Sequence, residues 1–322
     1  MAVIEKEGNT MTSIKKDRFE WVGPNKEKSE GISRPSINFW QDAFIRLKKN
    51  KAALVCMGII VFILLMAIFV PIFSPYTISE QHMTHQNKGM FYVAEDGHMH
   101  LFGTDQLGRD LFVRIWSGAR ISLTIAFVAV FVNLIVGMIY GGVAGYVGGM
   151  TDNIMMRIVE VINGIPYLMV VILLTSIMST RGVASLIIAY AATGWTGMAR
   201  LVRGQVIQLK EQEFITAAKL MGAKPMRIIL KHLLPNTLSV VIVNITLAIP
   251  SAIFTEAYLS FIGLGVSQPM ASWGTLANEG VQQFRIYPHE MFVPAFFICI
   301  TMLAFNLLGD GLRDAFDPRL RR

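Results

Sequence analysis

Four histidines lie in one polar stretch, and their spacing could allow them to bind a metal ion. His82 and His85 lie three residues apart, and His98 and His100 lie two apart. Imidazole is a common nitrogen ligand of transition metals, so such spacings could hold one. No cysteine or ordered ligand pattern accompanies these histidines. We therefore predict a solvated loop and keep metal binding as the alternative.

Motifs for covalent or phosphoryl chemistry are missing from the sequence. It contains no G-x-x-x-x-G-K-[ST] phosphate loop, no H-E-x-x-H and no nucleophile elbow. Cys56 and Cys299 fall inside apolar segments and are expected to be buried packing residues rather than a disulfide or a metal pair. We predict a non-enzymatic chain that needs no cofactor of its own.

The composition is typical of a polytopic membrane protein. Of 322 residues, 53% are hydrophobic and only 16% are charged. The net charge of +7 could suggest nucleic acid. However, the basic residues cluster at the ends of apolar segments, as the positive-inside rule describes. We therefore expect a lipid bilayer, and no nucleic acid, as a partner.

Six apolar segments predict an all-α fold with six transmembrane helices, because a crossing needs about 20 mostly apolar residues. Pro166 is expected to kink the third helix, and Gly194 to break the fourth. The segments are residues 52–73, 121–140, 154–178, 183–199, 236–254 and 291–308.

The charge distribution gives an orientation and a division of the chain. Lysines and arginines precede the first span and fill the loop between spans four and five. The positive-inside rule therefore places that loop and both termini in the cytoplasm. We predict a mobile cytoplasmic tail (1–35), an amphipathic interfacial helix (36–51), the first span (52–73), an extracytoplasmic loop (74–118), a core with helices two to six and a cytoplasmic loop at 200–236 (119–309), and a cytoplasmic tail (310–322).

The cytoplasmic loop contains an amphipathic pair of short helices, residues 213–236. Gly222 can adopt the left-handed conformation that ends the first helix, and Pro225 suits the first turn of the second. The predicted apolar stripes follow an i, i+3, i+4, i+7 pattern, namely Phe214, Ala217, Ala218 and Met221, then Met226, Ile229, Leu230 and Leu233. By itself this pattern also fits an interfacial hairpin without a partner.

This segment resembles the EAA loop of permease subunits of bacterial ABC importers. The family pattern is Glu-Ala-Ala, three residues, Gly, nine residues, Ile, one residue and Leu-Pro. The spacing matches here, but Thr216 stands in place of the glutamate and His232 in place of the isoleucine. The ending His-Leu-Leu-Pro-Asn is similar to the oligopeptide and dipeptide branch. The resemblance implies an ATPase-coupling role for Glu213, Phe214, Thr216, Ala217, Ala218, Gly222, His232, Leu234, Pro235 and Asn236.

A second resemblance precedes the second span. Peptide permeases of the C type carry a similar Gly-Thr-Asp-x-x-Gly-Arg-Asp segment, which Gly103, Thr104, Asp105, Gly108, Arg109 and Asp110 match. Thr104 or Asp105 could cap a helix, and Arg109 could pair with Asp105 at i, i+4. The segment is either an extracytoplasmic rim that meets a partner permease or binding protein, or a capped surface helix.

Few polar groups lie within the predicted spans. Gly137, Gly141 and Gly145 recur every four residues, which favours close helix packing, with a hinge as the alternative. Asn133, Asn163, Asn244 and Asn306 are expected to bond between helices. Asp, Glu, Lys, Arg and His are absent from the span centres, which argues against an ion-coupled secondary carrier.

Together the resemblances imply a type I ABC importer transmembrane domain in a bacterial plasma (inner) membrane. Its partners would be a second homologous permease, two cytoplasmic ATP-binding subunits and an extracytoplasmic substrate-binding protein. Oligopeptides or dipeptides are the expected substrates. The alternatives are a nickel or metallophore importer of the same superfamily, a self-sufficient carrier or channel, and a scaffold without transport.

Overall fold

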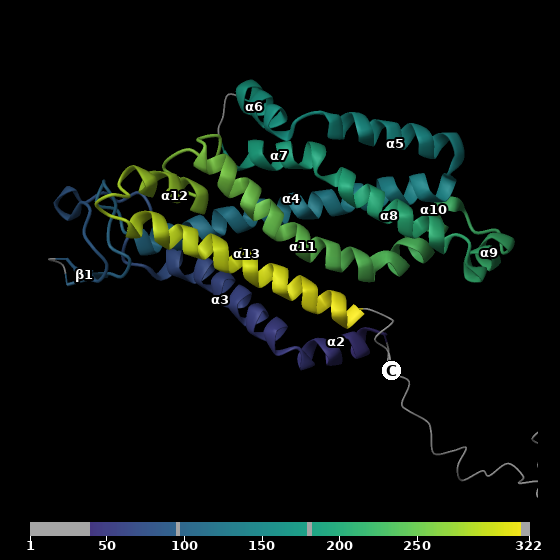
Figure 1. Ribbon diagram of the computed structural model, residues 1–322, viewed down its shortest axis with the longest axis horizontal. Coiled ribbons are helices and arrows are strands. Elements are labelled where there is room, and N and C mark those ends of the chain that lie inside the picture. Colours follow the sequence, from purple (N-terminus) through teal and green to yellow (C-terminus); the bar gives the residue numbers. More distant parts are fainter. Residues whose placement is uncertain (1–38, 95–96, 179–181, 317–322) are drawn as a thin grey trace, which may run out of the picture. The chain divides into compact units, whose positions relative to one another are not determined.

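The described chain is built almost entirely from helices, which follow the apolar segments of the sequence, and Figure 1 shows their arrangement. The structure is a computed structural model that describes residues 39–94, 97–178 and 182–316. It is mostly helical (77%), and residues 43–322 form one compact unit. The tail predicted at 1–35 lies outside the described residues, as do positions 317–322 of the tail predicted at 310–322.

The described elements run in this order: α2 (Phe39–Lys49), α3 (Lys51–Phe73), η3 (Met83–His85), β1 (Tyr92–Val93), β2 (Met99–His100), α4 (Leu111–Val147), α5 (Gly149–Gly164), α6 (Tyr167–Ile177), α7 (Val183–Thr193), α8 (Trp195–Leu209), α9 (Glu213–Leu220), α10 (Pro225–Ile228), η4 (Ile229–Leu233), α11 (Leu234–Phe261), α12 (Trp273–Gln282) and α13 (His289–Phe316). Strands β1 and β2 pair antiparallel, with Tyr92 opposite His100.

Four helical stretches of the described chain are long and apolar enough to cross a membrane, namely α3, α4, Pro225–Phe261 and α13. Helices α5 and α6 pass the same test only as a pair, bent by 79°. The number of candidate spans is therefore four, or five if the bent pair is one span. The segment predicted as span four is divided between α7 and α8 at Gly194. A total of six stays a prediction.

The break between α5 and α6 is sharper than the predicted kink, and it has a local cause. Pro166 lacks the N–H that would continue a helix, and the residue before a proline is pushed toward extended backbone. Ile165 accordingly has φ −85° and ψ 122°, and Pro166 caps α6. The two helices therefore leave this point in different directions.

Helix α4 is 37 residues long, and its second half packs closely against α8. The glycine stripe faces this contact. A Cβ added to Gly137 would lie 2.6 Å from the Cβ of Met198, and one added to Gly145 would lie 2.8 Å from the carbonyl oxygen of Arg203. The glycines therefore permit the approach of the two backbones, which supports the packing interpretation.

The largest apolar cluster joins α3, α4, α11, α12 and α13. Trp273 of α12 is fully buried in it and donates its indole N–H to the carbonyl of Ile115, 3.0 Å away. Cys56 belongs to this cluster, as expected. The prediction for Cys299 was wrong, because its side chain is exposed on the outer surface of α13.

The two ends of the 43–322 unit differ in character (Figure 1). One end carries the β-hairpin, the start of α4 and α12, and the other carries α9, α10 and the start of α11. Helix α2 lies within the interfacial segment predicted at 36–51, and its Trp40 and Phe44 are exposed, as an interfacial helix requires.

Candidate functional site

Residues 213–236 form two short helices joined by a glycine turn. Helix α9 ends at Leu220, and Gly222 has φ +77°, the left-handed conformation that the sequence predicted. Pro225 is the first residue of α10, where its missing N–H costs nothing. A single wide turn, η4, then leads directly into α11. The chain thereby returns to the membrane helices within one compact segment.

One face of this segment is buried. Ile215 and Ala218 of α9, Ile228 of α10, and Ile229 and Leu233 of η4 belong to one cluster with Val202 and Val206 of α8. The Lys219 ammonium also lies 5.7 Å from the ring centre of Tyr146 in α4. These contacts fix the segment to α8 and to the end of α4.

The opposite face is exposed and strongly apolar. Leu220 and Met221 are 85% and 82% exposed, and Phe214, Met226 and Leu230 are also exposed. Of the eight residues in the predicted stripes, only Ala218, Ile229 and Leu233 are buried. Periodicity detected two apolar faces but could not tell which one meets the protein. An exposed apolar surface of this kind is typical of an interaction site.

The other predicted residues of the segment lie around this exposed face. Glu213, Thr216 and Ala217 are exposed on α9, and Pro235 and Asn236 are exposed at the start of α11. His232 is half-buried, and its carbonyl accepts a hydrogen bond of 2.6 Å from the Asn236 amide. Leu234 is buried against the cluster.

The second predicted motif, at the other end of the unit, is buried. Gly103, Thr104, Asp105, Gly108, Arg109 and Asp110 all have buried side chains or backbones. Asp105 accepts from the Arg109 guanidinium at 2.7 Å, which confirms the predicted pair. Its other carboxylate oxygen accepts from the backbone N–H of Leu107 and of Arg109, both at 2.9 Å.

The helix cap predicted in this motif was assigned to the wrong residue. Thr104 and Asp105 precede a turn, and the cap of α4 is Asp110, whose carboxylate accepts from the Val113 N–H at 2.7 Å. Gly103 and Gly108 have φ near +81° and +71°, and a Cβ on either would collide with loop backbone. Because of this turn, α4 begins only at Leu111.

Sequence reasoning missed the partner that the motif binds. Arg114 is almost fully buried and contacts both Asp105 and Glu279 of α12, the latter at 2.8 Å. Arg109 reaches the same Glu279 at 3.3 Å. No local spacing relates α4 to α12, so only the fold could reveal this network. It makes the motif a buried tie between the loop and α12 rather than a capped surface helix.

The prediction of solvated histidines was wrong for two of the four, since His98 is exposed and His82 partly exposed. His85 and His100 are buried, and His100 stacks on Tyr76 with ring centres 4.5 Å apart. Its Nδ1 lies 2.6 Å from the Asp110 carboxylate. Aromatic stacking therefore removes these rings from water. Within the described residues, no group of three His, Cys, Asp or Glu side chains could hold a metal ion.

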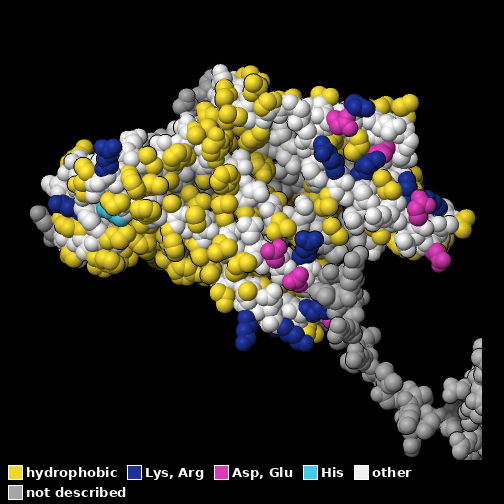
Figure 2. Space-filling view, viewed as in Figure 1, with side chains coloured by type: hydrophobic (Ala, Val, Ile, Leu, Met, Phe, Trp, Pro, Cys, Tyr) yellow, Lys and Arg dark blue, Asp and Glu magenta, His cyan; other side chains and the backbone are white. Residues whose placement is uncertain are grey.

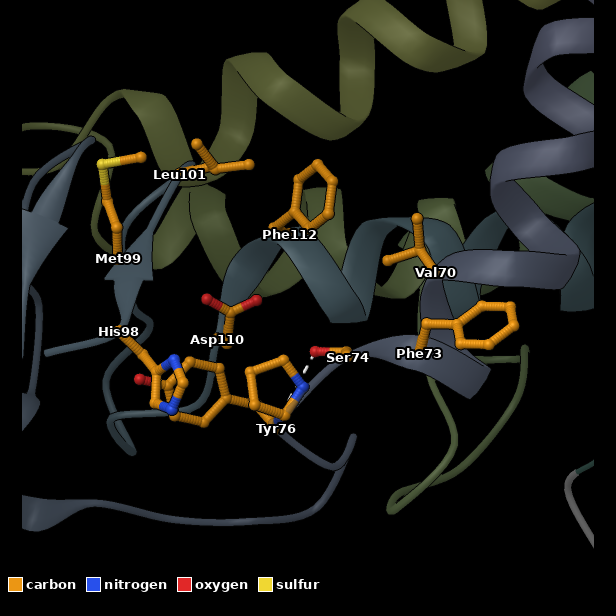
Figure 3. A pocket seen from close by; sticks show the side chains of 10 residues that line it. Val70, Phe73, Ser74, Tyr76, His98, Met99, Leu101, Asp110 and Phe112 are labelled. Atoms are coloured by element: carbon orange, nitrogen blue, oxygen red, sulfur yellow. Dashed lines mark hydrogen bonds between the residues drawn. The ribbon is translucent and has the colours of Figure 1, made fainter. Parts of the chain in front are cut away.

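A cavity of about 300 Å³ lies beside this cluster (Figure 3). Val70 and Phe73 of α3 and Phe112 of α4 form its apolar side, and His98 and Asp110 lie on its polar side. The carboxylate of Asp110 is already engaged by His100 and by the cap of α4. The lining therefore holds no nucleophile with an adjacent base.

Glu256 is the one ionisable group that the structure buries deeply within α11, among the described residues. Its carboxylate accepts hydrogen bonds of 2.7 Å from Ser122 of α4 and from Ser260. The Ser122 oxygen in turn accepts from the backbone N–H of Trp273, at the start of α12. Helix α11 extends to Phe261, beyond the span predicted at 236–254, and keeps Glu256 from water.

A further ion pair links α5 to α8. The Arg203 guanidinium donates two hydrogen bonds to the Asp152 carboxylate, from Nε at 2.5 Å and from Nη2 at 2.6 Å. The hydrogen bond to Asp152, and then its charge, raise the pKa of Arg203, although partial burial opposes this. Arg203 therefore keeps its charge at every physiological pH.

Charged side chains gather at the end with α9 and α10, and hydrophobic side chains cover much of the middle of the same view (Figure 2). This distribution fits a chain whose middle faces lipid and whose ends face water. The exposed apolar residues of α9 and its turn therefore lie among charged side chains.

Two family descriptions match this chain. "Binding-protein-dependent transport system inner membrane component" matches residues 134–322. "N-terminal TM domain of oligopeptide transport permease C" matches residues 38–89. The first match covers more than half of the chain and includes the whole of α5 to α13.

Named relatives agree along nearly the whole length. The oligopeptide transport system permease protein OppC of Bacillus subtilis is 48% identical, over 97% of this chain and 100% of that protein. The dipeptide transport system permease protein DppC of the same organism is 51% identical, over 94% of each chain. OppC of Escherichia coli K12 is 41% identical, over 91% of this chain and 95% of that protein.

A solved structure shares the fold. It is an inward-facing conformation of the MetNI methionine ABC transporter, with a TM-score of 0.50 and 22% identity, covering 63% of this chain and 96% of the solved one. At this identity the likeness concerns the fold alone. With the family match and the relatives above, the chain belongs to the inner-membrane components of binding-protein-dependent transport systems, a family of multi-span, non-catalytic permease subunits of ABC transporters.

Proposed function

We propose that this chain is the C-type permease subunit of an ATP-driven importer of oligopeptides or dipeptides. The names of relatives at 48% and 51% identity support the peptide class. It would work with a second homologous permease, two ATP-binding subunits and an extracytoplasmic binding protein. The relatives named above give no support to the alternative of a nickel or metallophore importer.

The orientation that fits this function places residues 213–236 in the cytoplasm. Lys219, Lys224, Arg227 and Lys231 lie in the segment, and the β-hairpin lies at the opposite end of the unit. Positive charge favours the cytoplasmic side of a membrane protein. With this orientation, the N- and C-termini are cytoplasmic, and the end of the unit that contains the buried motif around Asp105 lies on the side of the binding protein.

The observation that carries the proposal is the two-faced structure of this segment. One face is buried against α8, and the other exposes Leu220 and Met221 almost completely. A segment held this way can receive a force on its free face and pass it to the helix beneath. We propose that the ATP-binding subunit docks on this face and that its closure moves α8, so that the permease alternates between inward and outward access.

The docking is tested by Met221→Glu and Leu220→Glu. Each change places a charge on an exposed surface, so the fold of this chain should not suffer, whereas an apolar interface should lose about 2 kcal/mol or more. We expect the ATP-binding subunits to dissociate during copurification and peptide uptake to fall at least tenfold.

Met83→Glu is the matched control, because Met83 is 62% exposed but lies in the loop at the opposite end. It should retain the ATP-binding subunits. Undiminished copurification of Met221→Glu with those subunits would contradict the docking surface. Gly222→Trp, which strains a residue at φ +77°, should also abolish uptake.

The substrate is tested by uptake in cells that lack other peptide importers. We expect cells with this system to accumulate labelled di- and oligopeptides, and we expect this uptake to stop when this chain is deleted. Accumulation of nickel with no uptake of peptides would instead identify the related metal importers.

A further inference from the structure

The pair Asp152–Arg203 lies at a crossing of two helices next to the proposed docking segment. Arg203 is in α8, whose end at Leu209 is separated from α9 by only Lys210, Glu211 and Gln212. Asp152 is in the first turn of α5, directly after the Gly148–Gly149 turn, in which both glycines have positive φ. The ion pair therefore connects the helix that leads to the docking segment with the start of the bent pair α5–α6.

The backbone at Arg203 is held as well as its side chain. A Cβ on Gly141 would lie 3.0 Å from the Arg203 nitrogen, and one on Gly145 would lie 2.8 Å from its carbonyl oxygen. The glycines of α4 therefore hold this point of α8 at close range. Any displacement of α8 at this level must move the guanidinium and whatever it binds.

A second bond ties the same two helices farther along. The Thr196 hydroxyl of α8 donates to the Asn163 side chain of α5 at 2.8 Å. The earlier residue of α5, Asp152, bonds to the later residue of α8, Arg203, and the later one, Asn163, bonds to the earlier one, Thr196. The two helices therefore run antiparallel, with the bonds about two to three turns apart. Between the two bonds, Val159 is fully buried in a cluster with Ala199. Helix α5 therefore contacts α8 near both of its ends.

The other face of α5 has no contact of this kind. Met150, Ile154, Ile158 and Val161 are all exposed, between 47% and 74%. Lys210 is the other cation close to Asp152, but the bidentate bond to Arg203 sets the geometry. A bidentate carboxylate–guanidinium contact fixes direction as well as distance, which a single point charge does not.

We propose that Asp152 and Arg203 are positioning residues that transmit the movement of the docking segment from α8 to α5 and α6. The proposal rests on the proposed function, since it presupposes that closure of the ATP-binding subunits moves residues 213–236. It assigns to the pair a role in transport that is separate from holding the chain folded. Without the pair, α8 would move while the start of α5, on its glycine turn, would lag.

The test measures coupling separately from assembly in the complete, reconstituted importer. We expect Asp152→Asn and Arg203→Lys to retain the partner subunits and to hydrolyse ATP at a rate within about twofold of the unchanged importer. Peptides transported per ATP should fall about tenfold. A purely structural pair would instead lower assembly, ATP hydrolysis and uptake together, and that result would overturn the proposal, as would unchanged transport per ATP.

The exposed pair Arg157–Glu160 is the matched control on the same helix. Its side chains are 79% and 55% exposed, and its bond is 2.6 Å. Glu160→Gln removes it without touching α8, so transport per ATP should stay unchanged. An equal loss in Glu160→Gln and Asp152→Asn would also contradict the proposal.

A covalent replacement makes the test reversible. In a background of Cys56→Ala and Cys299→Ala, Asp152→Cys and Arg203→Cys would be joined by a short, reducible thiol cross-linker. We expect the linked importer to regain transport per ATP and to lose it again on reduction. If Met221→Glu releases the ATP-binding subunits but the cross-link restores nothing, the docking surface stands and this inference fails.

Discussion

Buried charged groups in this chain depend on partners both near and distant in sequence. Asp105 binds Arg109 and Arg114, and Arg114 also binds Glu279, so one carboxylate from the loop and one from α12 share two guanidinium groups. Arg114 is 1% exposed. Removing one partner of such a network leaves an uncompensated buried charge, which costs more than the pair itself contributes.

We therefore expect Arg114→Gln to destabilise the protein strongly, by about 3–5 kcal/mol. The loss should appear as a lower midpoint in thermal unfolding of the purified protein in detergent. Arg120→Gln, at an exposed position of the same helix, should leave the midpoint nearly unchanged. Equal midpoints for the two variants would refute the network as a structural tie.

At the scale of elements, the contact between α4 and α8 decides how force could travel. The glycines of α4 bring α8 within backbone distance, and the docking segment packs on α8 directly. Movement of that segment should therefore shift α8 as a body. Because α5 and α6 are bent by 79° relative to each other, a movement along α5 would reach α6 in a different direction.

Two identical substitutions separate packing from helix propensity. At Gly141, a Cβ would collide with the carbonyl of Ala199, so Gly141→Ala should destabilise by about 1–3 kcal/mol. At Gly58 of α3, nothing lies within 4 Å, so Gly58→Ala should stabilise slightly, by up to about 1 kcal/mol. The measurement is thermal unfolding of both variants, and the same sign for both would contradict the packing interpretation.

The whole molecule has the features of one part of a larger machine. Its described residues carry an exposed apolar surface on α9 and the following turn, which is the proposed docking face. Glu256 is satisfied by serines rather than aligned with other ionisable groups of the described helices.

We expect this chain alone in liposomes to transport no peptide, with or without a proton or sodium gradient. Addition of the second permease, the ATP-binding subunits and the binding protein should give ATP-dependent uptake. Gradient-driven uptake by the isolated chain would show that it is a secondary carrier instead.

The sequence by itself determined the apolar helices, the glycine turn at Gly222 and the pair Asp105–Arg109, because each depends on residues near one another in the chain. It also carried the family spacing, from which the class of protein followed. Only the tertiary structure decided which apolar face of residues 213–236 is free, that Asp110 caps α4, and that His85 and His100 are buried. The physical reason is that periodicity reports an amphipathic helix but not its neighbour. Pairs such as Asp152–Arg203 and Arg114–Glu279 join residues 51 and 165 positions apart, and they exist only once the helices have packed.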